Sequence, residues 1–265
     1  MNNPLAPPPC LILHGLGGGP FELAPLTAAI RGAGIEVTVP VLPGHDGAGP
    51  RMPGSTWTEW AGAVESAYDD LSGRTVGGRV SVVGFSTGAM LALHLATRRP
   101  VSRLLLLAPF LAIRFARWIP VRSSVWLGPI ARVVPHLPRR GAATVNRAVR
   151  AELAGATRFR TFNLPSTLSA LALIEEVRPS VGAIRAPTLI LQGKRDTVVE
   201  PSGSRWLLAH LGSAEKRLVW FPRSDHLLPW DHDRVAVIET GLMFLLDTRI
   251  PDGNAPLQGP LPGPV

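Results

Sequence analysis

Short apolar runs alternate with amphipathic segments along most of this 265-residue chain. The strand-like runs are Cys10–His14, Ile35–Val41, Arg79–Gly84, Ser102–Leu107, Pro187–Gln192 and Lys216–Phe221. The helix-like segments are Pro20–Gly34, Thr56–Leu71, Thr87–Arg98, Pro201–Leu211 and Asp231–Leu246. This alternation is typical of an α/β fold, in which helices flank both faces of a mostly parallel sheet.

The alternation stops between residues 109 and 186, where the chain has broken helical pieces, several prolines and many arginines. This interval is too long for an ordinary connection between sheet elements. We therefore predict a core of residues 1–108 and 187–250, with an inserted helical cap at 109–186. The cap is expected over the carboxyl edge of the sheet, where open α/β sheets bind ligands. The Pro/Gly-rich tail, 251–265, is expected to be disordered.

Charge and hydropathy argue against several classes of protein. Lys and Arg number 27 against 19 Asp and Glu, a net charge of +8, but the basic residues are dispersed and no nucleic-acid-binding motif accompanies them. We expect no nucleic-acid partner and first attribute the arginines to GC-rich coding, with attraction to anionic lipid or acidic substrates as the alternative. No apolar run reaches the roughly 18 residues of a membrane-spanning helix.

The N-terminus lacks the order of a secretory signal, in which a basic segment precedes an apolar one. Cys10 is the only cysteine, so no intramolecular disulfide can form. Both observations favour a cytoplasmic location. Cys10 itself begins an apolar strand, where it is expected to pack as a small hydrophobic residue rather than to act as a nucleophile.

The sequence Gly84-Phe85-Ser86-Thr87-Gly88 stands between a β-branched strand and a helix. A Gly-x-Ser-x-Gly turn in this context is the nucleophile elbow, in which the serine hydroxyl projects above the sheet. Glycines are needed because larger side chains at the two flanking positions would clash in so tight a turn. Ser86 is therefore the predicted nucleophile.

A serine hydroxyl needs a base and an acid that orients this base, and in this kind of sheet both follow the serine in chain order. Asp196 comes just after the strand Pro187–Gln192, and His226 follows the strand Lys216–Phe221. Both side chains are thus expected at the carboxyl edge, beside Ser86. Asp225 is the alternative acid, and the other candidate histidines are His94, His136, His210 and His232.

The charged tetrahedral intermediate of acyl transfer needs backbone N–H donors. By position, these donors are the N–H groups of Thr87 and of Leu16, in the glycine-rich turn that follows the first strand. A turn that binds no ligand remains the alternative, whereas a phosphate loop is disfavoured because no Gly-Lys-Ser/Thr follows. His14 is expected to brace this loop rather than to act as a second base.

Five motifs occur in an order and spacing that resemble the α/β-hydrolase superfamily, and more narrowly small bacterial carboxylesterases and monoacylglycerol lipases. The motifs are His14-Gly15, Pro43-Gly44-His45-Asp46, Gly84-Phe85-Ser86-Thr87-Gly88, Gly193-Lys194-Arg195-Asp196 and Ser224-Asp225-His226. The resemblance spans about Leu11 to Leu246 and implies a serine esterase that needs no cofactor. It supports Ser86, Asp196 and His226 as the triad and Leu16 and Thr87 as oxyanion donors.

The chain departs from these esterases at three places. They often have an aromatic residue at the position of Leu16 and Met, Leu or Gln at that of Thr87, and the arginine-rich cap differs most. Leu16, Phe85, Trp118 and Trp126 are the candidate substrate-contacting residues. The cap residues Leu111, Ile113, Phe115 and Ile119 either line an acyl pocket or simply pack the cap, while Arg114, Arg117 and Arg122 either meet anionic lipid or face solvent.

The expected substrate is a small ester, of short to medium acyl chain or a monoacylglycerol, cleaved through an acyl-enzyme. The elbow does not distinguish this reaction from cleavage of a C–C or amide bond by the same triad. A non-catalytic ligand-binding protein on this fold is the alternative from another class. The oligomeric state is not predicted by the sequence.

Overall fold

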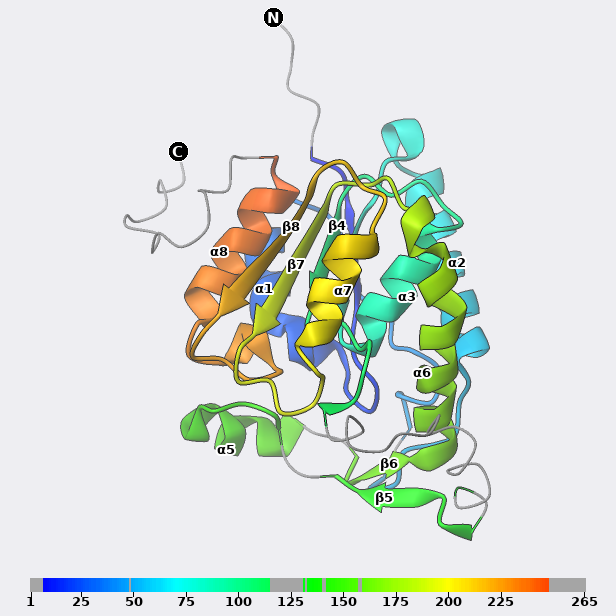
Figure 1. Cartoon of the computed structure of the whole chain (residues 1–265), viewed down its shortest axis with the longest axis vertical. Coiled ribbons are helices and arrows are strands. Elements are labelled where there is room, and N and C mark those ends of the chain that lie inside the picture. Colours follow the sequence, from blue (N-terminus) through cyan, green and yellow to red (C-terminus); the bar gives the residue numbers. More distant parts are fainter. Residues whose placement is uncertain are drawn as a thin grey trace, which may run out of the picture.

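The computed structural model describes residues 7–47, 49–114, 131, 133–139, 142–156 and 159–247. Within these residues a central parallel sheet has the strand order β2-β1-β3-β4-β7-β8. Its strands are β1 (Cys10–Leu13), β2 (Val37–Thr38), β3 (Ser81–Phe85), β4 (Leu104–Leu107), β7 (Thr188–Gly193) and β8 (Lys216–Phe221). Figure 1 shows β4, β7 and β8 of this sheet side by side. The parallel arrangement brings the carboxyl ends of all these strands to one edge.

Helices cover both faces of the sheet. The α-helices of the described residues are α1 (Ala24–Gly32), α2 (Trp57–Gly73), α3 (Thr87–Ala96), α5 (Arg147–Ala156), α6 (Leu164–Val177), α7 (Ser202–His210) and α8 (Arg234–Leu245), of which α5 does not cover either face (Figure 1). Helices α1 and α8 pack together on one face, and α2, α3, α6 and α7 lie on the other (Figure 1). The predicted fold class is therefore confirmed. No helix in the described residues is both long and apolar enough to cross a membrane.

The core lies where both faces of the sheet are covered. Every residue of β1, β3, β4 and β7 is buried. Strand β4 consists of four consecutive leucines, with no polar residue alternating between them. Helices on both sides explain this pattern, because neither face of the strand meets water.

The strand expected at Ile35–Val41 is much shorter in the structure. Only Val37 and Thr38 pair with β1, opposite Cys10 and Leu11. The pairing occurs at the edge of the sheet, and Pro40 has no N–H to donate to a strand ladder. The prediction was therefore right in place and wrong in extent.

The described part of the interval 109–186 contains a second small sheet, in which β5 (His136–Pro138) and β6 (Thr161–Asn163) are antiparallel. These strands and α5 lie beyond the carboxyl edge of the main sheet (Figure 1). Helix α6 instead packs against α2 and α3. The division into core and cap at 109 and 186 stays a prediction. The tail 251–265 lies outside the described residues.

Candidate active site

Ser86 occupies the turn between β3 and α3, with φ 55° and ψ −118°. Residues other than glycine rarely adopt a positive φ, so the backbone of Ser86 is strained. The surrounding contacts must stabilise this conformation. The N–H of Ser86 donates to the carbonyl of Leu107 at 2.9 Å, and the carbonyl of Ser86 accepts from the N–H of Ala89 at 3.0 Å. These bonds fix the serine at the amino end of α3.

Gly84 and Gly88 allow the close packing around this turn. A Cβ added to Gly84 would lie 2.4 Å from the carbonyl oxygen of Gly88, and one added to Gly88 would lie 2.3 Å from that of Leu13. Both distances are far inside van der Waals contact, and the atoms in the way belong to the backbone. The two glycines of the motif are therefore required by the approach of β1, β3 and α3.

The structure brings Ser86, Asp196 and His226 together. His226 Nε2 lies 3.0 Å from Ser86 Oγ, and His226 Nδ1 lies 2.9 Å from Asp196 Oδ2. The three residues follow β3, β7 and β8, and all three side chains are buried. Their meeting depends on the parallel sheet, because the pairs are 140 and 30 residues apart in the chain.

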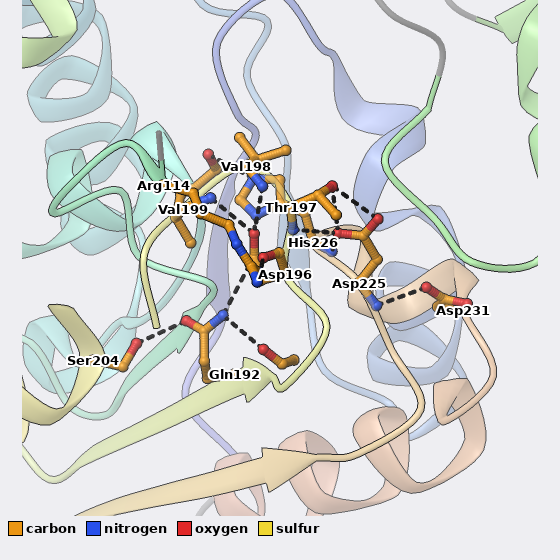
Figure 2. Close-up of polar contacts among 12 residues, drawn as sticks. Arg114, Gln192, Asp196, Thr197, Val198, Val199, Ser204, Asp225, His226 and Asp231 are labelled. Carbon is orange, nitrogen blue, oxygen red and sulfur yellow. Dashed lines mark hydrogen bonds and ion pairs between the residues drawn. The ribbon is translucent and has the colours of Figure 1, made fainter. Parts of the chain in front are cut away.

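The carboxylate of Asp196 is 0% exposed and is surrounded by donors (Figure 2). Its Oδ1 accepts the N–H groups of Val198 at 2.9 Å and Val199 at 2.8 Å. Its Oδ2 accepts Gln192 Nε2 at 2.9 Å in addition to the imidazole. Ser204 Oγ in turn donates to Gln192 Oε1 at 2.8 Å, so α7 helps to orient the group that holds Asp196.

Electrostatics favour charge separation in this pair. Burial opposes the charged form of both groups. The charge and hydrogen bond of Asp196 nevertheless raise the pKa of His226 above its usual value, while His226 and the surrounding N–H donors lower the pKa of Asp196. An ionised Asp196 accepts a hydrogen bond from the Nδ1–H of His226, which leaves the Nε2 lone pair facing Ser86 Oγ.

Asp225, the alternative acid of the sequence analysis, does not bond the imidazole of His226. Its Oδ1 accepts the N–H of Thr197 at 2.7 Å, the hydroxyl of Thr197 at 2.9 Å and the backbone N–H of His226 at 2.7 Å (Figure 2). Its own N–H donates to Asp231 Oδ2 at 2.8 Å. Asp225 thus shapes the loop that carries His226, whereas Asp196 bonds the imidazole.

The turn after β1 lies directly against the serine. A Cβ on Gly15 would be 3.2 Å from the Cβ of Ser86. The Gly15 carbonyl accepts from His14 Nδ1 at 2.9 Å and from the N–H of Gly18 at 3.2 Å. The N–H of Leu16 and the carbonyl of Gly15 belong to one trans peptide unit and therefore point in opposite directions. The N–H thus points away from His14 Nδ1 and the N–H of Gly18.

The N–H groups of Leu16 and Thr87 are both available for a ligand. Among the hydrogen bonds between described residues, neither group has an acceptor. Thr87 is the first residue of α3, where an N–H has no partner inside the helix. The two N–H groups predicted as oxyanion donors therefore belong to the turn after β1, which lies against Ser86, and to the residue that follows Ser86; their role stays a prediction.

Two neutral histidines brace the turn. His14 Nε2 accepts the N–H of Leu42 at 3.1 Å, and His45 Nε2 accepts the N–H of Gly17 at 2.9 Å. Burial and the neighbouring His45 lower the pKa of His14 to about 3. His14 is thus a neutral structural residue, which fits the bracing role expected for it.

Sequence reasoning missed Glu22 and Arg139. Glu22 Oε2 accepts the N–H of Gly15 at 3.0 Å, and Arg139 Nη2 lies 3.9 Å from Glu22 Oε1. Burial raises the pKa of Glu22, an effect that Arg139 opposes. No local motif marks either residue, because their link joins the turn after β1 to the residue after β5.

The substrate-contacting candidates are only partly described. The ring of Phe85 lies 4.9 Å from that of His226, and Leu16 is half-buried beside the core. Trp118 and Trp126 lie outside the described residues. Of the arginines considered for lipid contact, Arg114 donates from Nη1 to the Asp196 carbonyl.

Other histidines and the single cysteine were also considered as reactive groups. His94 packs against the ring of Trp57, and His210 stacks on Trp206. Among the described residues, neither histidine forms a hydrogen bond with Ser86, whereas His226 does. No group of three or more His, Cys, Asp or Glu side chains in the described ranges is arranged to hold a metal ion. Burial raises the pKa of the Cys10 thiol, which keeps it protonated and unreactive.

Comparisons with known proteins agree with this geometry. The family described as serine aminopeptidase S33 matches residues 8–233. A thermostable monoacylglycerol lipase from Bacillus sp. strain H-257 is 29% identical over 234 residues, which cover 88% of each chain.

Two solved structures are similar in fold. A structure of the metagenome-derived lipolytic enzymes LipS and LipT has a TM-score of 0.76 at 21% identity, covering 90% of this chain and 93% of that one. The monoacylglycerol lipase of Paleococcus ferrophilus has a TM-score of 0.75 at 20% identity, covering 91% of this chain and 96% of that one.

Gly88→Ala should destabilise the protein by about 3 kcal/mol or more, because its Cβ meets the backbone of β1. The matched control is Gly62→Ala, in the interior of α2, where an added Cβ meets nothing within 4 Å. Gly62→Ala should stabilise by about 0.5–1 kcal/mol. Urea unfolding followed by circular dichroism measures both. Equal stability of the two variants would contradict the close packing assigned to Gly88.

Proposed function

Because the chain belongs to the serine aminopeptidase S33 family and has the α/β-hydrolase fold, we propose that it is a serine hydrolase of carboxylic esters. One observation carries the proposal, namely the hydrogen-bonded chain from Ser86 through His226 to Asp196 at 3.0 and 2.9 Å. Such a chain converts a weakly nucleophilic hydroxyl into an effective nucleophile.

In the proposed reaction, Ser86 Oγ attacks the acyl carbon while His226 Nε2 takes the hydroxyl proton. Asp196 holds the Nδ1–H and stabilises the imidazolium that forms. The imidazolium then protonates the leaving alcohol as the ester C–O bond breaks, which leaves an acyl-enzyme. Water, deprotonated by His226, then attacks the acyl carbon. As the bond from the acyl carbon to Ser86 Oγ breaks, the carboxylic acid leaves and Ser86 Oγ takes the proton back from His226.

The oxyanion of each tetrahedral intermediate is proposed to accept the N–H groups of Leu16 and Thr87. Thr87 directly follows Ser86, and Leu16 directly follows Gly15, where an added Cβ would lie 3.2 Å from the Cβ of Ser86. Neither N–H has an acceptor among the described residues. Thr87 is also at the amino end of α3, where the helix dipole favours negative charge.

The proposed substrates are esters of short to medium acyl chain, including monoacylglycerols. The 29% identity to a monoacylglycerol lipase supports this class. Leu16 is the proposed acyl contact among the described residues, together with Trp118 and Trp126, which lie outside them. Phe85, also predicted as a contact, is only 2% exposed and belongs to the hydrophobic core, so we do not include it. Weak contact of the cap with a lipid surface is part of the proposal, since Val133, Val134 and Leu137 are exposed there by 82%, 44% and 41%.

Ser86→Ala should reduce hydrolysis of p-nitrophenyl butyrate by about 10³-fold or more, because the triad acts as a unit. Ser81→Ala is the matched control. Ser81 lies on the strand that leads to Ser86, and its buried hydroxyl has no partner in the described structure, so this variant should retain full activity.

Covalent labelling and a comparison of substrates separate the alternative functions. A fluorophosphonate probe should label the protein only when Ser86 is present, and absence of labelling would favour a binding protein. Unchanged ester hydrolysis by Ser86→Ala would refute the proposal. Faster cleavage of aminoacyl p-nitroanilides than of any ester in a chain-length series would redirect it to amide bonds.

Asp196→Asn should move the acidic limb of the kcat/KM profile to lower pH. The free enzyme is active when His226 is neutral, and the carboxylate raises the pKa of His226. Removing the charge lowers that pKa, so the neutral base persists further into acid. The plateau rate should fall by about 10⁴-fold, because the amide NH2 of Asn can donate to Nδ1 and thereby hold the imidazole in the tautomer whose Nε2 is protonated and cannot act as the base. A limb that moves to higher pH would contradict the assigned electrostatics.

A further inference from the structure

Arg139 extends from the cap interval into the site. It directly follows β5, and its backbone N–H donates to the carbonyl of Arg160 at 2.9 Å. Its side chain is only 12% exposed, and its guanidinium carbon lies 5.0 Å from the centre of the Phe162 ring. A cation so buried needs partners of matching geometry.

The first partner is Gly17, in the turn after β1. Arg139 Nη1 donates to the Gly17 carbonyl. Gly17 has φ +67°, and a Cβ there would meet Phe162 Cε1 at 2.9 Å. The N–H of Gly17 is held from the other side by His45 Nε2 at 2.9 Å. Arg139 and Phe162 therefore contact Gly17 on one side, while His45 holds its backbone N–H on the other.

The second partner is Glu22. Arg139 Nη2 lies 3.9 Å from Glu22 Oε1, while Glu22 Oε2 accepts the N–H of Gly15 at 3.0 Å. One ion pair thus holds the backbone on both sides of Leu16, at the Gly15 N–H and at the Gly17 carbonyl. Leu16 carries the oxyanion donor of the proposed function.

We propose that Arg139 is a positioning residue for the Leu16 N–H, so that the cap helps to build the oxyanion hole as well as to cover the substrate. This inference rests on the proposed esterase function. Oxyanion donors act only when they are aimed at the developing charge, and errors of about 1 Å cost up to 10²-fold in rate. Substrate affinity does not depend on that aim, because the ground-state carbonyl carries little charge.

Arg139→Met is the test variant, since it keeps the length of the side chain and removes the donors. With p-nitrophenyl acetate, kcat should fall about 10- to 100-fold while KM stays within about twofold. Arg139→Lys retains one cation that can reach Gly17 or Glu22 but not both, and should recover part of kcat. Glu22→Gln keeps an acceptor for Gly15 and should lose less than Glu22→Ala.

Arg150→Met is the matched control. Arg150 is also an arginine of the cap interval and donates to a backbone carbonyl, that of Thr144. Among the described residues, none of its hydrogen bonds reaches the turn after β1. Its substitution should leave kcat and KM unchanged. Titration with a fluorophosphonate counts the competent sites, so that kcat per titrated site separates mispositioning from partial unfolding.

The outcomes distinguish this inference from the function on which it rests. An unaltered kcat per site in Arg139→Met, or an equal loss in Arg150→Met, would overturn the positioning role while leaving the esterase intact. A rise in KM with kcat unchanged would also overturn it. If Arg139→Met does not fold, a kcat loss in Arg139→Lys at constant KM supports the role, and full activity overturns it. Wild-type protein without Ser86-dependent ester hydrolysis would sink both proposals.

Discussion

The buried charge of Asp196 is the constraint on which the carboxyl edge of the sheet depends. An ionised carboxylate with no exposure is tolerated only when its lone pairs meet donors. Those donors come from the end of β7, from the turn after it and from the loop after β8. The same turn is tied to the segment after β4, since the N–H of Arg114 donates to the carbonyl of Val198 at 3.1 Å. Satisfying one charge therefore fixes the imidazole opposite Ser86.

Most of the fold was predictable because the inner strands of its main sheet are buried on both faces. The leucines of β4 and the apolar residues of β7, all of them buried, form strands where the apolar pattern places them. The prediction was wrong in extent for β2, where edge pairing and Pro40 outweigh the β-branched composition of Ile35–Val41. In each case the burial of the segment, rather than its intrinsic propensity, decided the outcome.

The sequence predicted those residues of the candidate site whose position follows from the order of the strands. Ser86, Asp196 and His226 each follow a strand of one parallel sheet, so their approach follows from topology. Gln192 and Glu22 could not be found in this way, because their partners lie across turns or on another segment and no spacing marks them. The choice between Asp196 and Asp225 also required coordinates, since both are acids beside the correct loops.

The pair Glu22–Arg139 raises the question of why this protein would bury a second set of charges near Ser86, His226 and Asp196. Replacing a buried ion pair by apolar side chains is often neutral for stability, so stability alone is a weak reason for its presence. An apolar pair could not orient the backbone of the turn after β1 through hydrogen bonds. Glu22 accepts the N–H of Gly15, and Arg139 donates to the carbonyl of Gly17 in the same turn. Glu22 also favours the charged form of His226, as Asp196 does. One cluster therefore orients the imidazole that meets Ser86, and the other holds the turn that carries the proposed oxyanion donor Leu16.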